Sequence, residues 1–168
     1  MKLRTAIATF LLCASAGAAP AGAQAGFQNE ATLSSFSVEN VQPALRAAGA
    51  TSMRIETSAS GSRYVAATFS NNRTLVVAPR ACDDNGSNCV GLSIRAFWSK
   101  RESMSVDVAR KVIEQFNDTA VAGGTLLNGK TVLLSHYLIG DYGMPQGNVR
   151  VATIVFLSNL DTLRSSTT

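Results

Sequence analysis

Four strand-like segments stand close together between residues 52 and 98, separated by residue pairs that are typical of β-hairpin turns. The segments are SMRIETS, RYVAATFS, RTLVVAPRAC and CVGLSIRAFW, and the pairs are Ser60-Gly61, Asn71-Asn72 and Asn85-Gly86. Because such short loops reverse the chain between neighbouring strands, the pattern predicts a four-stranded antiparallel meander. This feature limits the fold more than any other in the sequence.

The turn positions also predict which side chains share a face, because side chains alternate along a strand. If each pair is the centre of a two-residue loop, one face is mostly apolar and the other mostly polar. The first holds Met53, Ile55, Tyr64, Ala66, Leu75, Val77, Leu92, Ile94 and Trp98. The second holds Arg54, Glu56, Ser58, Arg63, Ser93 and Arg95, and the apolar Val65, Phe69, Val76 and Phe97 among them indicate a partly covered face.

One helix is predicted before this meander in the sequence and one after it. The first covers VQPALRAAGA and starts at the preceding residue, Asn40, with Ser37 or Asn40 as cap, and Gly49 ends it. SMSVDVARKVIEQFND is the clearest helix, with Ser103 or Ser105 as cap. Its apolar residues recur at helical spacing, namely Val108, Ala109, Val112, Ile113 and Phe116.

A second hairpin turns at Asn128-Gly129, and a final segment of about residues 148–164 closes the chain. The β-branched run VRVATIVF also fits a strand, but no turn follows it, so we predict a helix. Its expected apolar side is formed by Val151, Ile154, Val155, Leu157, Ser158 and Leu163. The order αββββαββα predicts an α+β fold, with a four-strand meander, a late hairpin and three helices.

The N-terminus has the pattern of a secretory signal peptide at residues 1–23. Lys2 and Arg4 precede a short apolar stretch, and small residues allow cleavage after Ala23 or Ala25. The alternative is an uncleaved anchor helix. Cleavage would remove Cys13, leave a flexible lead-in at 24–36 and a single domain at 37–165, and place the protein in a periplasm or outside the cell.

Charge argues against nucleic acid as a partner. Without Lys2 and Arg4 the chain has 13 basic and 11 acidic residues, from 15 and 11 in the whole chain, and no run of Lys or Arg exceeds two. Nucleic-acid binding proteins usually carry a dense basic patch. We therefore expect no nucleic acid partner, and no membrane span in the mature chain.

Cys82 and Cys89 are the cysteines of the predicted mature chain, and the candidate roles for them are a zinc site, a redox pair and a disulfide. Zinc sites usually take four ligands at tighter spacing, and His136 is the one histidine of the chain. A redox pair usually has two residues between its cysteines, beside a helix N-terminus. An exported chain favours a disulfide, and Asn85-Gly86 at the turn places Cys82 opposite Cys89. The ladder geometry there predicts a looser or bulged turn.

No motif for a nucleophile, a phosphate, a dinucleotide or a catalytic metal occurs in the sequence. We therefore assign no catalytic, cofactor-binding or metal-ligating residue and expect no cofactor. His136 alternates with Val132, Leu134 and Leu138 on one strand face, where a structural role is the commoner one.

From Ser37 to Arg164 the chain resembles the YbjN-type family of bacterial domains, described as sensory transduction regulators. The resemblance is carried by VQPALRAAGA, by the strand block from Arg63 to Trp98 with its two cysteines, by EQFN at residues 114–117 and by TLLNGKTVLLSHYLIG. It implies a fold similar to type III secretion chaperones, which are small domains that bind segments of other proteins, and it implies no catalytic residues.

Two functional hypotheses follow. The first is an exported, non-enzymatic binding or regulatory module that engages a protein or peptide through a sheet face or a helix groove; self-association as a homodimer is left open. The alternative is a small periplasmic hydrolase whose site gathers His136, a carboxylate such as Asp141 and a hydroxyl.

Overall fold

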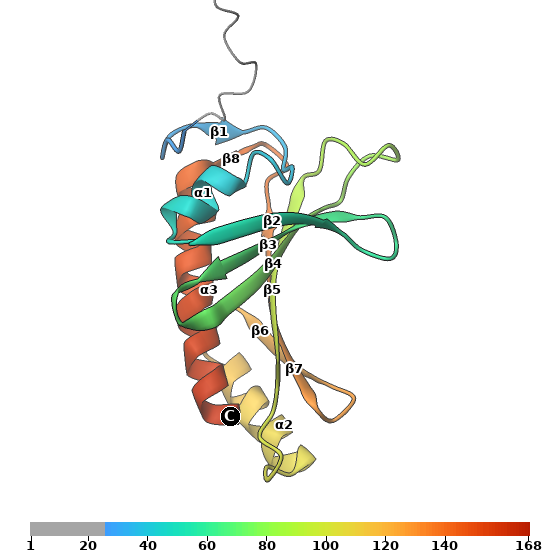
Figure 1. Ribbon diagram of the computed structural model, residues 1–168, viewed down its shortest axis with the longest axis vertical. Coiled ribbons are helices and arrows are strands. Elements are labelled where there is room, and N and C mark those ends of the chain that lie inside the picture. Colours follow the sequence, from blue (N-terminus) through green and yellow to red (C-terminus); the bar gives the residue numbers. More distant parts are fainter. Residues whose placement is uncertain (1–25) are drawn as a thin grey trace, which may run out of the picture.

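A six-stranded antiparallel sheet in the order β2-β3-β4-β5-β7-β6 organises the chain (Figure 1). The computed structural model describes residues 26–168, so the predicted signal peptide and its cleavage sites lie outside the described residues. The late hairpin joins the meander because β7 pairs with β5. The strands are β2 (Ser52–Thr57), β3 (Arg63–Phe69), β4 (Arg73–Arg80), β5 (Gly91–Ser99), β6 (Gly123–Leu127) and β7 (Thr131–Ile139).

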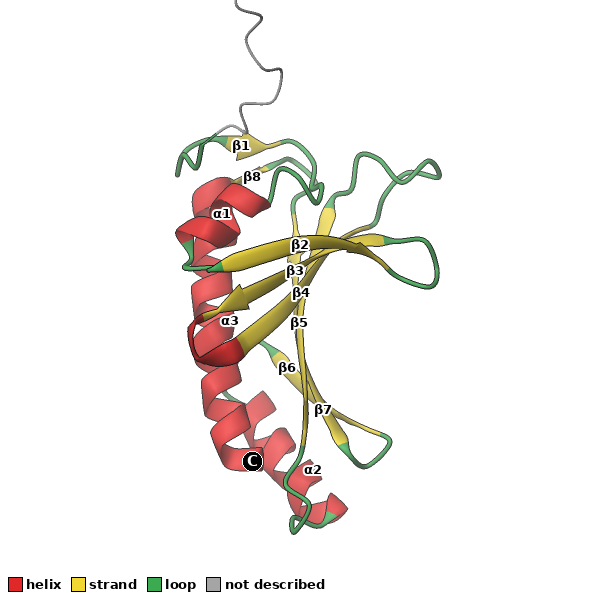
Figure 2. Cartoon of the chain, viewed as in Figure 1, coloured by secondary structure: helices red, strands yellow, loops and turns green. Residues whose placement is uncertain are grey.

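All three helices pack on one face of this sheet (Figure 2). They are α1 (Gln42–Ala47), α2 (Val106–Asn117) and α3 (Gln146–Thr167), with a short 3₁₀ turn η1 (Ser70–Asn72) between β3 and β4. Leu45 of α1 and Phe156 of α3 are buried against the sheet residues Leu75, Ile94 and Leu134. The α+β class and the order αββββαββα are confirmed, with two short strands added to that order.

The added strands, β1 (Thr32–Leu33) and β8 (Met144–Pro145), pair with each other in a separate two-stranded sheet. β1 lies within the predicted flexible lead-in, and Phe36 from the same segment is buried in the core. The chain therefore joins the fold before Ser37, where the sequence placed the start of the domain.

The predicted register is right for β4 and β5 but wrong for β3. Val77 pairs with Ile94, as expected from the turn at Asn85-Gly86. In β3, however, the core side chains are Val65, Ala67 and Phe69, rather than Tyr64 and Ala66. Both loops that flank β3 have an odd number of residues, five at 58–62 and three at 70–72, because Thr57 pairs with Arg63 and Phe69 pairs with Arg73. Each shift flips the face, so β3 alone is inverted.

The last segment is a helix, as predicted, but its buried side is different. Val151, Ile154 and Val155 are exposed, whereas Leu157 and Leu163 are buried as expected. The long Phe156 side chain fills the space above the sheet, and the β-branched residues beside it face outward. The buried residues are Gln146, Val149, Thr153, Phe156, Leu157, Leu160, Leu163 and Thr167.

The end of α1 agrees with the sequence, but the helix begins two residues later than predicted and no side chain caps its N-terminus. The two predicted caps bond to each other in the turn before the helix: the Ser37 amide donates to Asn40 Oδ1 (2.9 Å), and the Asn40 amide donates to Ser37 Oγ (3.1 Å). Gly49 follows the helix at φ +101°, and the Ala50 amide donates to the Leu45 carbonyl (3.1 Å). This left-handed residue ends the helix.

Replacing Ser105 by alanine will lower the free energy of unfolding by about 1 kcal/mol. Ser105 Oγ accepts a hydrogen bond from the Val108 amide (3.2 Å) at the start of α2, and alanine cannot accept it. Urea unfolding of the two proteins measures the difference. Ser103→Ala is the matched control, because the other predicted cap makes no such bond; an equal loss in both variants would contradict this role.

Candidate functional site

The cysteines at the end of β4 and before β5 form a disulfide, as the sequence predicted. The Sγ atoms of Cys82 and Cys89 are 2.00 Å apart. Cys89 is buried, and its carbonyl accepts a hydrogen bond from the Phe36 amide (2.7 Å). The disulfide thus ties the tip between β4 and β5 to the segment before α1. Among residues 26–168, no group of three or more His, Cys, Asp or Glu is placed to hold a metal ion.

The turn above the disulfide is looser than a two-residue hairpin, as the ladder geometry predicted. The Asp83 amide donates to the Ser87 carbonyl (2.9 Å), and the Gly86 amide donates to the Asp83 carbonyl (2.8 Å). The loop is therefore residues 84–86, one residue longer than a two-residue turn centred on Asn85-Gly86. Ala81 and Asn88 have positive φ angles of 48° and 49°. The backbone at these two residues accommodates the extra residue of the loop, so the β4–β5 register stays as predicted.

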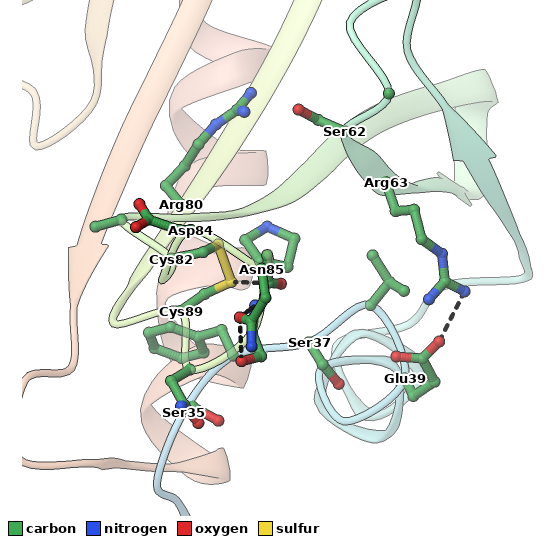
Figure 3. Close-up of a pocket in the computed structure, with 18 of the residues that line it drawn as sticks. Ser35, Ser37, Glu39, Ser62, Arg63, Arg80, Cys82, Asp84, Asn85 and Cys89 are labelled. Carbon is green, nitrogen blue, oxygen red and sulfur yellow. Dashed lines mark hydrogen bonds and ion pairs between the residues drawn. A yellow bond between two sulfur atoms is a disulfide. The ribbon is translucent and has the colours of Figure 1, made fainter.

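An open hollow of about 870 Å³ lies between this disulfide loop, the β2–β3 loop and the segment before α1 (Figure 3). Arg63 forms an ion pair with Glu39 in it (Nη2 to Oε1, 2.8 Å), and Arg80 also lines it. The rest of the lining is rich in hydroxyls, from Ser35, Ser37, Ser60, Ser62 and Ser87. The hollow brings together no nucleophile with a base, so it does not suggest a reaction.

His136 lies away from this hollow, on the face of the sheet that the helices cover. It pairs across the sheet with the buried Ile94, and its Nδ1 lies 3.1 Å from the Val121 carbonyl oxygen. Asp141 follows β7 in a turn, and neither residue lines the hollow. The structure therefore provides no arrangement around His136 that favours the hydrolase alternative.

The opposite face of the sheet has no helix packed on it in the described part of the chain (Figure 1). We call it the open face. One cross-strand row shows which residues belong to it, since paired residues share a face: Arg54, Ala66, Val76, Arg95, Ser135 and Gly123. The sequence predicted partial cover for this face, because apolar residues were expected on it. The inverted register of β3 instead places Val65 and Phe69 in the core, and no helix within residues 26–168 packs on the face.

Apolar side chains gather on the part of the open face formed by β5 and β7. Phe97, Tyr137 and Ile139 are 49%, 48% and 64% exposed. Phe97 pairs with the half-buried Leu133, and Tyr137 lies over Gly91, where any side chain would collide with its ring. Phe97 and Tyr137 lie two cross-strand rows apart, with the row of Arg95 and Ser135 between them. Exposed apolar side chains on one face of a small domain often mark a place where another molecule binds.

Arg95 brings a positive charge into this apolar area, between the rows of Phe97 and Tyr137. Its Nε is buried and has no hydrogen-bond partner among the described residues. Within residues 26–168, no carboxylate lies within ion-pair distance of its guanidinium. A buried donor without a partner is costly, so this group favours an incoming acceptor, best a negatively charged one.

The β2 side of the open face is polar, and its charges are already paired. Glu56 accepts a hydrogen bond from Tyr64 Oη (2.7 Å) and lies 3.3 Å from Arg54 Nη2. The hydrogen bond to Glu56 raises the pKa of Tyr64 above its usual value, because the phenolate would lose this bond and face a carboxylate. The two halves of the open face therefore differ in chemistry.

Part of the open face could be predicted from the sequence. Arg95, Val76 and Phe97 were assigned to the second face of the meander, and the alternation around His136 leaves Tyr137 and Ile139 on the other side of β7. The missing information was that β7 pairs with β5, which places the two apolar groups on the same face of one sheet.

Neither a scan against models of known protein families nor a search of the curated proteins finds a match to this chain. The resemblance to the YbjN-type family therefore stays a prediction. No helix within residues 26–168 combines the length and the apolar character that crossing a bilayer requires.

Proposed function

We propose that this protein is an exported, non-enzymatic binding module of the bacterial envelope, and that it engages a protein or peptide partner through the open face. The observation that carries the proposal is the exposure of Phe97, Tyr137 and Ile139 on a face that no described helix covers. Arg95 lies on the same face, and its Nε has no partner among the described residues. The best-fitting partner presents apolar side chains and a carboxylate, which would give Arg95 Nε an acceptor.

Export supports the same proposal. The Cys82–Cys89 disulfide is compatible with a compartment outside the cytoplasm, where such bonds persist. The signal-like N-terminus points in the same direction. A YbjN-like regulatory or chaperone-like role would use such a face to hold a segment of another protein, and it requires no catalytic group.

A photo-crosslinking amino acid at position 97 or 139 tests this proposal in intact bacteria. We expect a covalent adduct of defined mass from both positions on the open face. Val151 on α3 is the matched control, because its side chain is similarly exposed (54%) but lies on the helix side. Adducts from position 151 alone, an identical set from all three positions, or no adduct from the open face would contradict the proposal.

Phe97→Ser and Tyr137→Ser will each weaken binding of the crosslinked partner at least tenfold, since exposed aromatic residues dominate binding surfaces. The free energy of unfolding will change by less than about 1 kcal/mol, because about half of each side chain already contacts water. Affinity is measured by calorimetry and stability by urea unfolding. An unchanged affinity in both variants would remove the aromatic residues from the binding surface.

A further inference from the structure

The six-stranded sheet has two edges, and they differ. At the β6 edge, the Asn117 side chain of α2 bonds both backbone groups of Gly124: its Nδ2 donates to the carbonyl (3.0 Å) and its Oδ1 accepts from the amide (2.7 Å). The side-chain amide thus takes the place of a neighbouring strand. No such contact occupies the backbone of β2 among the described residues, and β2 is the other end of the sheet.

The pairing of β2 with β3 determines which backbone groups face this free edge. The Ser58 amide donates to the Ser62 carbonyl (2.9 Å), which makes this a hydrogen-bonded pair. Such pairs alternate along an antiparallel ladder, so the even-numbered residues of β2 bond to β3. Met53, Ile55 and Thr57 therefore direct their amides and carbonyls outward.

The side chains of β2 are complementary to those of β2 in a second, antiparallel copy of the protein. An antiparallel second copy centred on Ile55 would place Ile55 opposite Ile55, and Met53 opposite Thr57. These residues are the ones with free backbone groups, so the hydrogen bonds and the twofold symmetry require the same register. In this register each Arg54 lies opposite Glu56 of the second copy, in the closer, non-hydrogen-bonded type of pair.

The state of the single chain favours this arrangement. Ile55 is 41% exposed on the side of the sheet that otherwise forms the core, and a second copy would cover it. Glu56 is already held in place by the hydrogen bond from Tyr64 Oη (2.7 Å). The Arg54 side chain is largely exposed and free to move from Glu56 of its own chain to that of the second copy.

We propose that two copies of this protein associate through their β2 strands into one continuous antiparallel sheet, with Ile55 on the twofold axis and reciprocal Arg54–Glu56 ion pairs across it. The axis is perpendicular to the sheet, because cross-strand partners share a face. Both open faces then lie on the same side of the dimer. This proposal is independent of the open-face binding described above, and either one can fail alone.

Charge reversal tests the register. The protein, expressed from its complete coding sequence, is studied by sedimentation velocity over a wide range of concentration. We expect a concentration-dependent dimer, with at least tenfold weaker association for Arg54→Glu and for Glu56→Arg, since each places like charges opposite one another twice. The double variant R54E/E56R restores association to within about threefold, because it exchanges the two charges.

Mixing the two single variants is the sharpest measurement. Each variant alone carries like charges at the edge, but together they form complementary pairs, so the mixture associates where the separate proteins do not. Equal melting temperatures of all variants show that the single chains stay folded. A wild-type protein that is monomeric at every concentration, a dimer insensitive to both reversals, or a mixture that fails to associate would each overturn the proposal.

Ile55→Pro provides a second variant that does not depend on charge. Among the described residues the Ile55 amide has no hydrogen-bond partner, so proline removes a donor that only the dimer uses. We expect a folded monomer. A dimer that survives Ile55→Pro with unchanged association would overturn the strand pairing.

Discussion

Replacing Gly124 by valine will lower the free energy of unfolding by about 3 kcal/mol, at the upper end of what overpacking costs. Gly124 is buried in β6, where three neighbours surround the position of a side chain. A Cβ atom there would lie 2.9 Å from Leu163 Cδ2, 3.1 Å from Ile113 Cγ2 and 3.3 Å from Asn117 Oδ1. These contacts join α2, α3 and the sheet, so valine must push two helices away from β6.

Gly123→Val is the matched control for this experiment. The preceding residue lies in the same strand but is exposed, and no atom is within 4 Å of its ideal Cβ position. We expect the free energy of unfolding of this variant to lie within about 0.5 kcal/mol of that of the wild-type protein. Urea unfolding of both variants gives the comparison. Equal destabilisation would show that the packing around Gly124 does not cause the loss.

Reduction of the disulfide will lower the free energy of unfolding by about 2.5 kcal/mol, the value that the chain-entropy model gives for so short a loop. Cys82 and Cys89 are separated by seven positions, and the bond restricts the unfolded chain between them. Urea unfolding with and without a reducing agent measures the difference.

The double variant Cys82→Ala and Cys89→Ala is the control, because a reducing agent has no bond to break in it. Its stability should match that of the reduced wild-type protein to within about 1 kcal/mol, since alanine also removes the buried Cys89 sulfur. A thiol assay that finds two reactive cysteines in the exported protein would contradict the structural role of the bond.

Local signals in the sequence predicted much of this fold. Ser105 caps α2 and Gly49 ends α1 as predicted, because these features depend on bonds between residues a few positions apart. The pairing of β4 with β5 and the disulfide also followed from one turn. Such features are decided within a few residues and can be read without the rest of the chain.

The errors occurred where a single residue or a distant neighbour decides the outcome. The loops at 58–62 and 70–72 contain an odd number of residues, whereas two-residue loops were predicted. The side chains of β3 therefore point to the opposite faces from those predicted. The buried side of α3 depends on the sheet beneath it, so Phe156 packs inward while Val151 does not. Both sides of that helix carry apolar residues, and periodicity alone could not choose between them.

By itself, the sequence determined the α+β class, the order of the main elements, the disulfide, the cap of α2 and the end of α1, because these depend on hydrophobic period, turn residues and local bonds. Only the tertiary structure decided which surfaces remain available. The pairing of β7 with β5 assembles Phe97, Tyr137 and Arg95 on one uncovered face. Asn117 closes one edge of the sheet, and no residue among 26–168 bonds to the outer backbone groups of β2 at the other edge. Contacts between residues so far apart in the sequence follow from the fold, and no local pattern predicts them.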